Sequence, residues 1–155
     1  MSNKLYFQLQ FLKGTKNNTG SVLQLRPTKT GELIFELAPQ MGYEGHLPRF
    51  DYNSKFVFTL SEFEIAQISD LYSSGQEGKI NFPHLNAREP KTIIFENNFY
   101  NGNLQFKLTV LKEGKAINYF FTKTESDIFI KNLEDSTSLY NRMNAVLALR
   151  ELQGE

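Results

Sequence analysis

One short pattern occurs twice in this chain, and it constrains the fold more than any other feature. Residues 58–65 and 121–128 both read Phe-Thr-x-[Ser/Thr]-Glu-x-[Glu/Asp]-Ile, about 63 residues apart. Each copy follows a segment of alternating aromatic residues, which is typical of a strand. The repeat predicts a duplicated unit in which several strands precede a helix. Strand-to-helix junctions are common, so a chance match is the alternative.

Both copies carry a signal for the start of a helix. Ser61 is followed three residues later by Glu64, and Thr124 by Asp127. A hydroxyl oxygen at this position accepts a hydrogen bond from a free amide of the first turn, and the acid faces the positive end of the helix. The spacing therefore predicts N-caps at Ser61 and Thr124, with the second weakened by Asp in place of Glu.

Alternating apolar and polar residues predict four strands in each half of the chain. The predicted strands are residues 4–12, 21–26, 32–38 and 55–60, then 79–82, 92–96, 104–111 and 116–121. The segments 39–54, 73–90 and 97–103 are rich in turn residues and are predicted as connections, with Asn101-Gly102 as a hairpin turn. The last thirty residues predict one long helix, or two that meet near residues 135–138.

These elements predict an α+β protein of two antiparallel sheets, each followed by a helix. A chain of 155 residues fits one domain, 1–155, made of two related halves at about 1–75 and 76–155. Seventeen basic and 17 acidic residues balance, which argues against binding duplex DNA through bulk positive charge. No cysteine, signal peptide or membrane-spanning run is found, so we expect a soluble cytoplasmic protein.

Catalytic and metal-binding signals are weak. His46 and His84 are the only histidines, and neither has a partner at metal-ligand spacing. The sequence has no P-loop, dinucleotide fingerprint or nucleophile elbow. We therefore expect no enzymatic activity, no catalytic or metal-binding residue and no cofactor.

Aromatic and basic residues are interleaved on predicted strands and loops. Single-stranded nucleic acid is bound in this way, because bases stack on aromatic faces while cations contact phosphates. Packing of the same aromatics in a core is the alternative for each residue alone. The candidates are the aromatics Tyr6, Phe50, Tyr52 and Tyr100 and the cations Lys4, Lys13, Arg49, Lys55, Lys91 and Lys107.

The order of segments resembles the Whirly-like single-stranded-DNA-binding family. The resemblance rests on residues 31–42, on Asp51-Tyr52 before the strand and helix of the first copy, and on residues 118–125 before the last helix. It implies two four-stranded sheets, homo-oligomers that are often tetramers, and binding of single strands with little sequence preference in replication, recombination or repair. Of the family's Lys-Gly-Lys motif in the first strand, only Lys4 is present.

A second hypothesis is a protein-interaction module with the same fold and no nucleic-acid binding. An apolar helix stripe is commonly buried against a partner helix. The stripe here would be Leu139, Tyr140, Met143, Val146 and Leu147. Binding of RNA in place of DNA stays open, since no residue pattern reads a 2′-hydroxyl.

Overall fold

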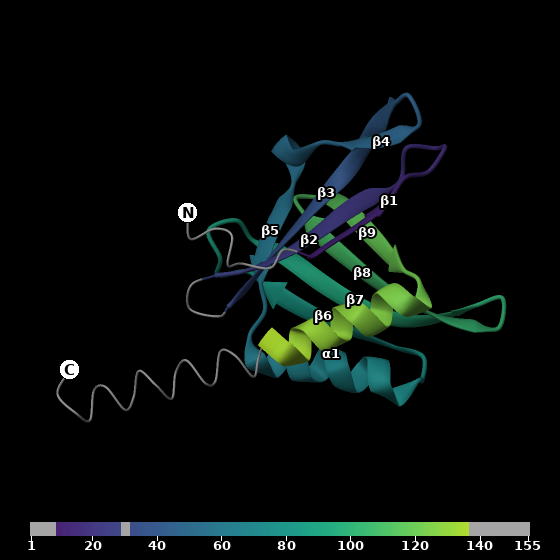
Figure 1. Cartoon of the computed structure of the whole chain (residues 1–155). Coiled ribbons are helices and arrows are strands. Elements are labelled where there is room, and N and C mark those ends of the chain that lie inside the picture. The colour runs from purple at the N-terminus through teal and green to yellow at the C-terminus, as the bar shows by residue number, and fades with distance from the viewer. Residues whose placement is uncertain (1–8, 29–31, 137–155) are drawn as a thin grey trace.

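The computed structural model describes residues 9–28 and 32–136, which form two antiparallel sheets and two helices (Figure 1). The first sheet contains β1 (Leu9–Lys13), β2 (Ser21–Pro27), β3 (Leu33–Glu44), β4 (Leu47–Phe50) and β5 (Phe56–Thr59). The second contains β6 (Gly78–His84), β7 (Lys91–Tyr100), β8 (Asn103–Lys112) and β9 (Lys115–Phe121). Helix α1 (Glu62–Ser74) follows the first sheet, and a second helix covering residues 123–136 follows the other. The predicted fold class is confirmed.

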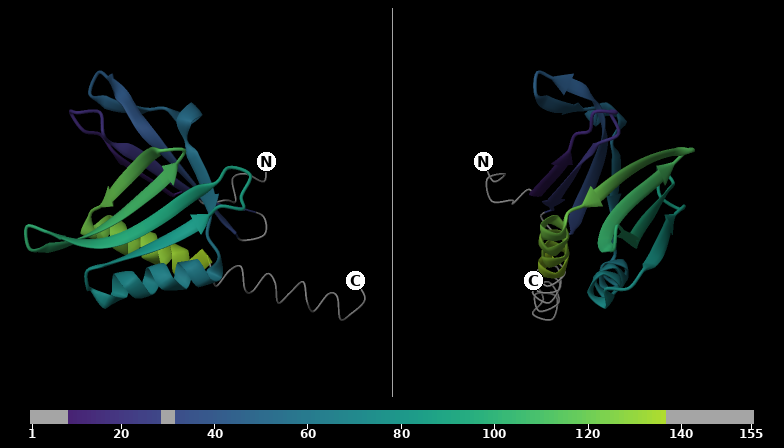
Figure 2. Two further views of the ribbon diagram at one scale, coloured as in Figure 1. Left: turned by 180° about the vertical axis from the view of Figure 1, so that it is seen from behind. Right: turned by 90° about the vertical axis from the view of Figure 1, so that its right-hand side faces the viewer.

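The two sheets are inclined to each other, and the helices lie side by side beneath them (Figure 2). The Ser69 hydroxyl donates to the Glu134 carboxylate at 2.6 Å, which joins the two helices. In the described part of the chain, no helix is long and apolar enough to cross a membrane.

The first sheet departs from the prediction in the segment 39–54, which was expected to be a connection. Strand β3 continues to Glu44, turns at Gly45 with a φ of 65°, and returns as β4. The register between β3 and β4 shifts between Gln40 and Tyr43, which breaks the apolar alternation there. Neither the second part of β3 nor β4 can therefore be predicted from alternation. Strand β5 pairs with the first part of β3 and β4 with its second part. A short 3-10 helix (Tyr52–Ser54) separates them.

The second sheet has its strands in chain order, β6-β7-β8-β9. The Asn101-Gly102 turn is confirmed, and both residues have positive φ, as a tight hairpin turn requires. Strands β6 and β7 are longer than predicted. Asn97, expected in a connection, is fully buried in β7, where its side-chain amide donates to the carbonyls of Leu71 and Gln76. Such bonds satisfy the free carbonyls at the end of α1, a role that only the folded chain reveals.

The core lies between the two sheets and the helices, and Phe129 of the second helix is at its centre. Its side chain is fully buried. Its ring centroid lies 4.8 to 6.3 Å from those of five other phenylalanines, with offset and tilted geometries typical of aromatic clusters. These partners come from both sheets and are Phe11, Phe35, Phe95, Phe106 and Phe121. One helix residue thus joins the two halves into a single core.

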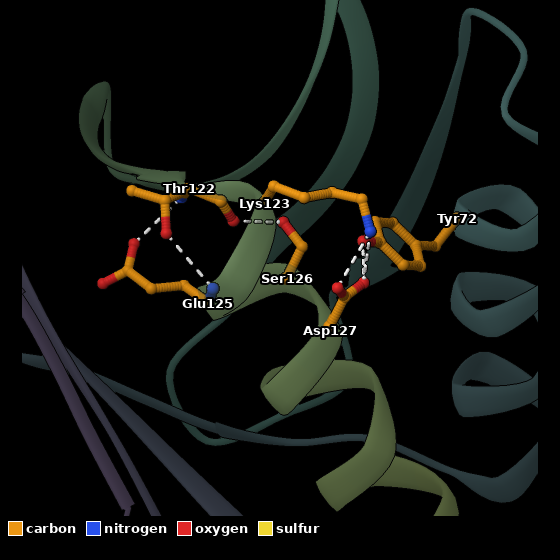
Figure 3. A network of polar contacts seen from close by, with 6 residues as sticks. All are labelled: Tyr72, Thr122, Lys123, Glu125, Ser126 and Asp127. Atoms are coloured by element: carbon orange, nitrogen blue, oxygen red, sulfur yellow. Dashed lines mark hydrogen bonds and ion pairs between the residues drawn. The ribbon is translucent and has the colours of Figure 1, made fainter.

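The first predicted cap is confirmed, and the second is wrong by two residues. The Ser61 hydroxyl accepts from the Glu64 amide, and the Glu64 carboxylate accepts from the Ser61 amide. In the second half, Thr122 and Glu125 make this reciprocal pair, at 3.1 and 2.9 Å (Figure 3). Strand β9 reaches Phe121 and the helix begins directly after Thr122, so Thr124 is already inside the first turn.

Asp127, predicted to support the second cap, has a different role. Its carboxylate accepts from the Lys123 ammonium at 2.8 Å and from the Tyr72 hydroxyl of α1 (Figure 3). The Lys123 hydrogen bond, followed by that of Tyr72, lowers the pKa of the Asp127 carboxyl group. The sequence repeat is therefore offset from the structural repeat, and the second copy of the acid connects the two helices.

Candidate nucleic-acid interface

The outer face of the second sheet is the side turned away from the helices. Its side chains alternate with the buried Phe95, Phe106 and Tyr119. One row of directly opposed residues crosses all four strands on this face: Lys79, Glu96, Lys107 and Phe120. A cation, an acid, a second cation and an aromatic ring therefore lie side by side on one surface.

Lys107 lies between the acidic residue and the aromatic residue of this row. Its Nζ is 5.2 Å from the ring centroid of Phe120 and 4.0 Å from Oε1 of Glu96. Phe120 is 39% exposed, so part of an aromatic side chain meets solvent next to an ammonium group. A stacking surface with an adjacent cation is what a single nucleotide needs.

Amide and hydroxyl groups surround this row on the same face. The Thr109 hydroxyl donates to Oδ1 of Asn118 at 2.6 Å, and these residues are directly opposed on β8 and β9. Asn98 and Gln105 form another opposed pair toward the far end of the sheet. The face thus offers hydrogen-bonding groups of both kinds beside the aromatic ring.

The first sheet completes the surface at the edge of β9. Nζ of Lys13, at the end of β1, donates to the carbonyl oxygen of Phe120 at 2.7 Å and lies 5.6 Å from the ring centroid of Tyr119. The Ser21 hydroxyl of β2 donates to the carbonyl oxygen of Asn118. These side chains satisfy edge carbonyls to which no strand of residues 9–28 and 32–136 is paired. They also place the ammonium of Lys13 beside the same phenylalanine as Lys107.

A second group of predicted residues lies on the β3–β4 hairpin and the short helix after it. Tyr52 is 44% exposed, Phe50 is half-buried, and Arg49 is exposed with its Nε 4.0 Å from Glu44. These three residues, called the ridge below, have the predicted types of side chain, and Arg49 and Tyr52 are the exposed ones.

Lys55 is close to this ridge but is bound on the first sheet's outer side. Its Nζ lies 3.3 Å from Oε1 of Glu36, and the same oxygen is 3.3 Å from the Arg26 guanidinium. The Glu36 side chain is largely buried between these two cations, and buried charged groups are usually paired in this way. Lys55 thus has an acidic partner within the protein.

The structure separates Lys91 and Tyr100 from the other candidates. Lys91 is only 6% exposed on the inner side of β7, its Nζ donates to the Glu89 carbonyl, and burial lowers the pKa of the amine. It therefore does not face a ligand in solution. Tyr100 is 66% exposed at the β7–β8 hairpin, where it borders a cavity of about 540 Å³ with Asn103, Gln105 and Lys123.

Of the predicted residues, Lys107 is brought to the ring of Phe120, and Lys13 to the main-chain carbonyl of the same residue. Arg49, Phe50 and Tyr52 form a separate ridge, and Lys4 and Tyr6 lie outside the described residues, as does the predicted C-terminal stripe. The sequence reasoning missed Phe120. Its signal was the alternation in residues 116–121, which directs Phe120 to the face opposite Tyr119 and Phe121.

The described residues contain no group of three His, Asp or Glu side chains placed to bind a metal ion. Nε2 of His84 lies 2.7 Å from Oε2 of Glu64, so this histidine connects β6 to the start of α1. His46 is in the β3–β4 turn. The geometry near each histidine is explained by local structure.

No protein-family model and no curated protein matches this chain. Its fold is similar to WHY1 from Arabidopsis thaliana, at 17% identity and a TM-score of 0.64 over 94% of this chain and 93% of that one. It is also similar to WHY3 from Arabidopsis thaliana, at 14% identity and 0.60 over 96% of each chain. The plant transcriptional regulator PBF-2 matches at 18% identity and 0.61, over 96% of this chain and 92% of that one. The Whirly-like fold expected from the sequence is confirmed.

Proposed function

We propose, on the premise of this Whirly-like fold, that the chain binds single-stranded nucleic acid with little sequence preference and is not an enzyme. The observation that carries the proposal is the partly exposed Phe120 ring beside the ammonium group of Lys107, with the Lys13 ammonium on the main-chain carbonyl of the same residue. The sequence resemblance to single-stranded-DNA-binding proteins supports DNA as the ligand, with a role in replication, recombination or repair.

In the proposed mode, a base stacks on Phe120 and the flanking phosphates contact Lys107 and Lys13. Base–aromatic stacking tolerates any sequence, because every base has a π-face. Asn118 and Thr109 supply hydrogen-bonding groups for base edges on the same surface. The exposed ridge residues Arg49 and Tyr52 extend the binding surface on the first sheet.

The test is a fluorescence-polarisation titration of a poly-thymidine 32-mer, with a duplex of the same length as control. We expect binding of the single strand alone, weakening as salt is raised, because phosphate contacts release counterions. Phe120→Ala should weaken binding about tenfold, since a stacked base contributes about 1–3 kcal/mol. The matched control is Phe63→Ala, which removes an 84% exposed phenylalanine from α1 on the helix side.

The outcomes separate the two hypotheses drawn from the sequence. Absence of binding at low salt, with the protein folded, would contradict nucleic-acid binding and leave a protein-interaction module as the better reading. Equal binding of a poly-uridine strand would extend the proposal to RNA. Self-association into a homo-oligomer such as a tetramer belongs to the proposal too, and light scattering on the full chain tests it.

A further inference from the structure

A cavity of about 530 Å³ lies where the start of β5 faces the β8–β9 hairpin. Both halves of the chain contribute to it: Asn53, Lys55 and Phe56 come from the segment at the start of β5, and Lys112, Glu113, Lys115 and Ile117 from the β8–β9 hairpin, so one acidic residue borders it beside the lysines. It is at the opposite end of β9 from Phe120 and shares no lining residue with the Lys107 row. Its volume is in the range of small-molecule sites in proteins.

Two of its lysines stand directly opposite each other. Lys112 and Lys115 are the last pair of the β8–β9 ladder, and they are joined by a tight turn in which Glu113 and Gly114 both have positive φ. Directly opposed side chains share one face of a sheet, and like charges in that position destabilise it. An anion between the two ammonium groups removes this repulsion.

The side chain of Lys112 is held in place within the cavity. Its Nζ lies 2.8 Å from Oε2 of Glu89 and 5.7 Å from the ring centroid of Phe56, and the side chain is only 20% exposed. Glu89 itself is 59% exposed, so a stronger anion can replace this carboxylate at little cost in desolvation.

The other two lysines of the cavity differ. Lys55 borders the cavity, but its Nζ is bound to Glu36 on the outer side of the first sheet, so it is not counted as a phosphate ligand. Lys115 is exposed and forms no ion pair within residues 9–28 and 32–136. Pro39, Phe56 and Ile117 give the cavity apolar lining residues, and Asn53 gives an amide.

We infer that this cavity binds a nucleoside monophosphate unit, with the phosphate between Lys112 and Lys115 and the nucleoside against the apolar lining residues. The cations match a phosphate dianion, and the amide of Asn53 offers a donor and an acceptor to the base or sugar. The unit is either a free nucleotide or the phosphorylated end of a strand, since both present the same chemistry. The inference goes beyond the proposed function, because a nucleotide can bind in this cavity whether or not the protein binds along a single strand of nucleic acid.

The experiment is a titration of the full ¹⁵N-labelled chain with thymidine monophosphate, followed by amide chemical shifts. We expect saturable shifts in residues 53–56 and 112–117. Lys115→Gln should weaken the affinity about tenfold, the value of one charged hydrogen bond. The control Lys131→Gln, on the second helix, should bind as the unaltered chain does. No shift at millimolar nucleotide, or full affinity in Lys115→Gln, overturns the inference.

Further titrations distinguish a free nucleotide from the end of a strand, and test whether the nucleoside contributes to binding beyond the phosphate. A 5′-phosphorylated oligothymidine that binds more tightly than its 5′-hydroxyl form, with the difference abolished by Lys115→Gln, indicates a strand end. Shifts with thymidine monophosphate and no such difference indicate a free nucleotide. Inorganic phosphate that binds as tightly as the nucleotide overturns the nucleoside part.

The inference and the proposed function fail separately. Phe120→Ala should leave nucleotide binding unchanged while it weakens binding of the 32-mer. Nucleotide binding without binding of the 32-mer would contradict the proposed function alone. The reverse result would overturn this inference alone.

Discussion

Nζ of Lys13 donates to the main-chain carbonyl of Phe120 at 2.7 Å, although the two residues are separated by 107 positions in the chain. This bond joins the end of β1 to the free edge of β9, and so connects the two halves of the protein through one ammonium group. Sheet edges need such partners, because their main-chain groups are otherwise open to another strand.

Lys13→Met should therefore lower the free energy of unfolding by about 1 kcal/mol, the usual net value of one hydrogen bond. Urea unfolding, followed by circular dichroism, measures the change. Lys16→Met is the matched control, because Lys16 is exposed in the β1–β2 loop. An equal effect of both substitutions would mean that loss of charge, and not loss of this bond, is responsible.

The second helix should depend on Thr122 and not on Thr124. Thr122→Ala removes the hydroxyl that accepts from the Glu125 amide, and loss of an N-cap lowers the free energy of unfolding by about 1 kcal/mol. Thr124 is exposed inside the first turn, so Thr124→Ala should change stability little. Thermal or urea unfolding of the two variants compares them directly, and the reverse order would restore the cap expected from the sequence repeat.

Lys91 should lower stability at neutral pH, because burial disfavours its charged form and lowers its pKa. Between this lowered pKa and the ordinary value of 10.5, the unfolded chain binds more protons, so the contribution of Lys91 to stability rises with pH. We expect Lys91→Met to shift the urea midpoint upward at pH 7. The difference from the unaltered chain should narrow as the pH approaches 10.5.

The same variant tests the part that Lys91 was predicted to play in binding. Because the amine is buried, Lys91→Met should bind the 32-mer as the unaltered chain does. Weaker binding by a folded Lys91→Met protein would show that β7 opens to admit the strand.

Glu96 should limit the affinity for a single strand. Its carboxylate already neutralises Lys107 at 4.0 Å, so a phosphate must displace it. Glu96→Gln should raise affinity about threefold and steepen the salt dependence by about 0.7, the value for one additional phosphate contact on a single strand. Asp70→Asn, at an exposed position of α1, makes the same change in net charge away from the surface and should have little effect.

The unequal success of the sequence-based prediction has local causes. The Ser61 cap and the Asn101-Gly102 turn were predicted well, since each depends on a few neighbouring residues and on backbone conformation alone. The β3–β4 hairpin was missed, because the register shift after Gln40 interrupts the alternation. Asn97 was assigned to a connection, because residues 97–103 are rich in Asn and contain Gly, as turns commonly are.

The candidate site was only partly predictable. The sequence shows which aromatic and basic residues are on strands, and the alternation in residues 116–121 predicts that Phe120 is on the outer face. No local pattern shows that Lys13 meets the carbonyl of Phe120, because that contact joins residues far apart in the chain. The Asn101-Gly102 turn, in contrast, fixes the register that places Glu96 opposite Lys107. Burial of Lys91 depends on which face of β7 meets the core.

The sequence by itself determined both helices, the strands other than β4, the Asn101-Gly102 turn and the first cap, because these follow from periodicity and from interactions between near neighbours. The tertiary structure decided which lysines are paired, which is buried, and which aromatic ring faces solvent. It also decided that Phe129 unites both halves in one core. Such properties depend on contacts across the two sheets, which no stretch of the chain encodes alone.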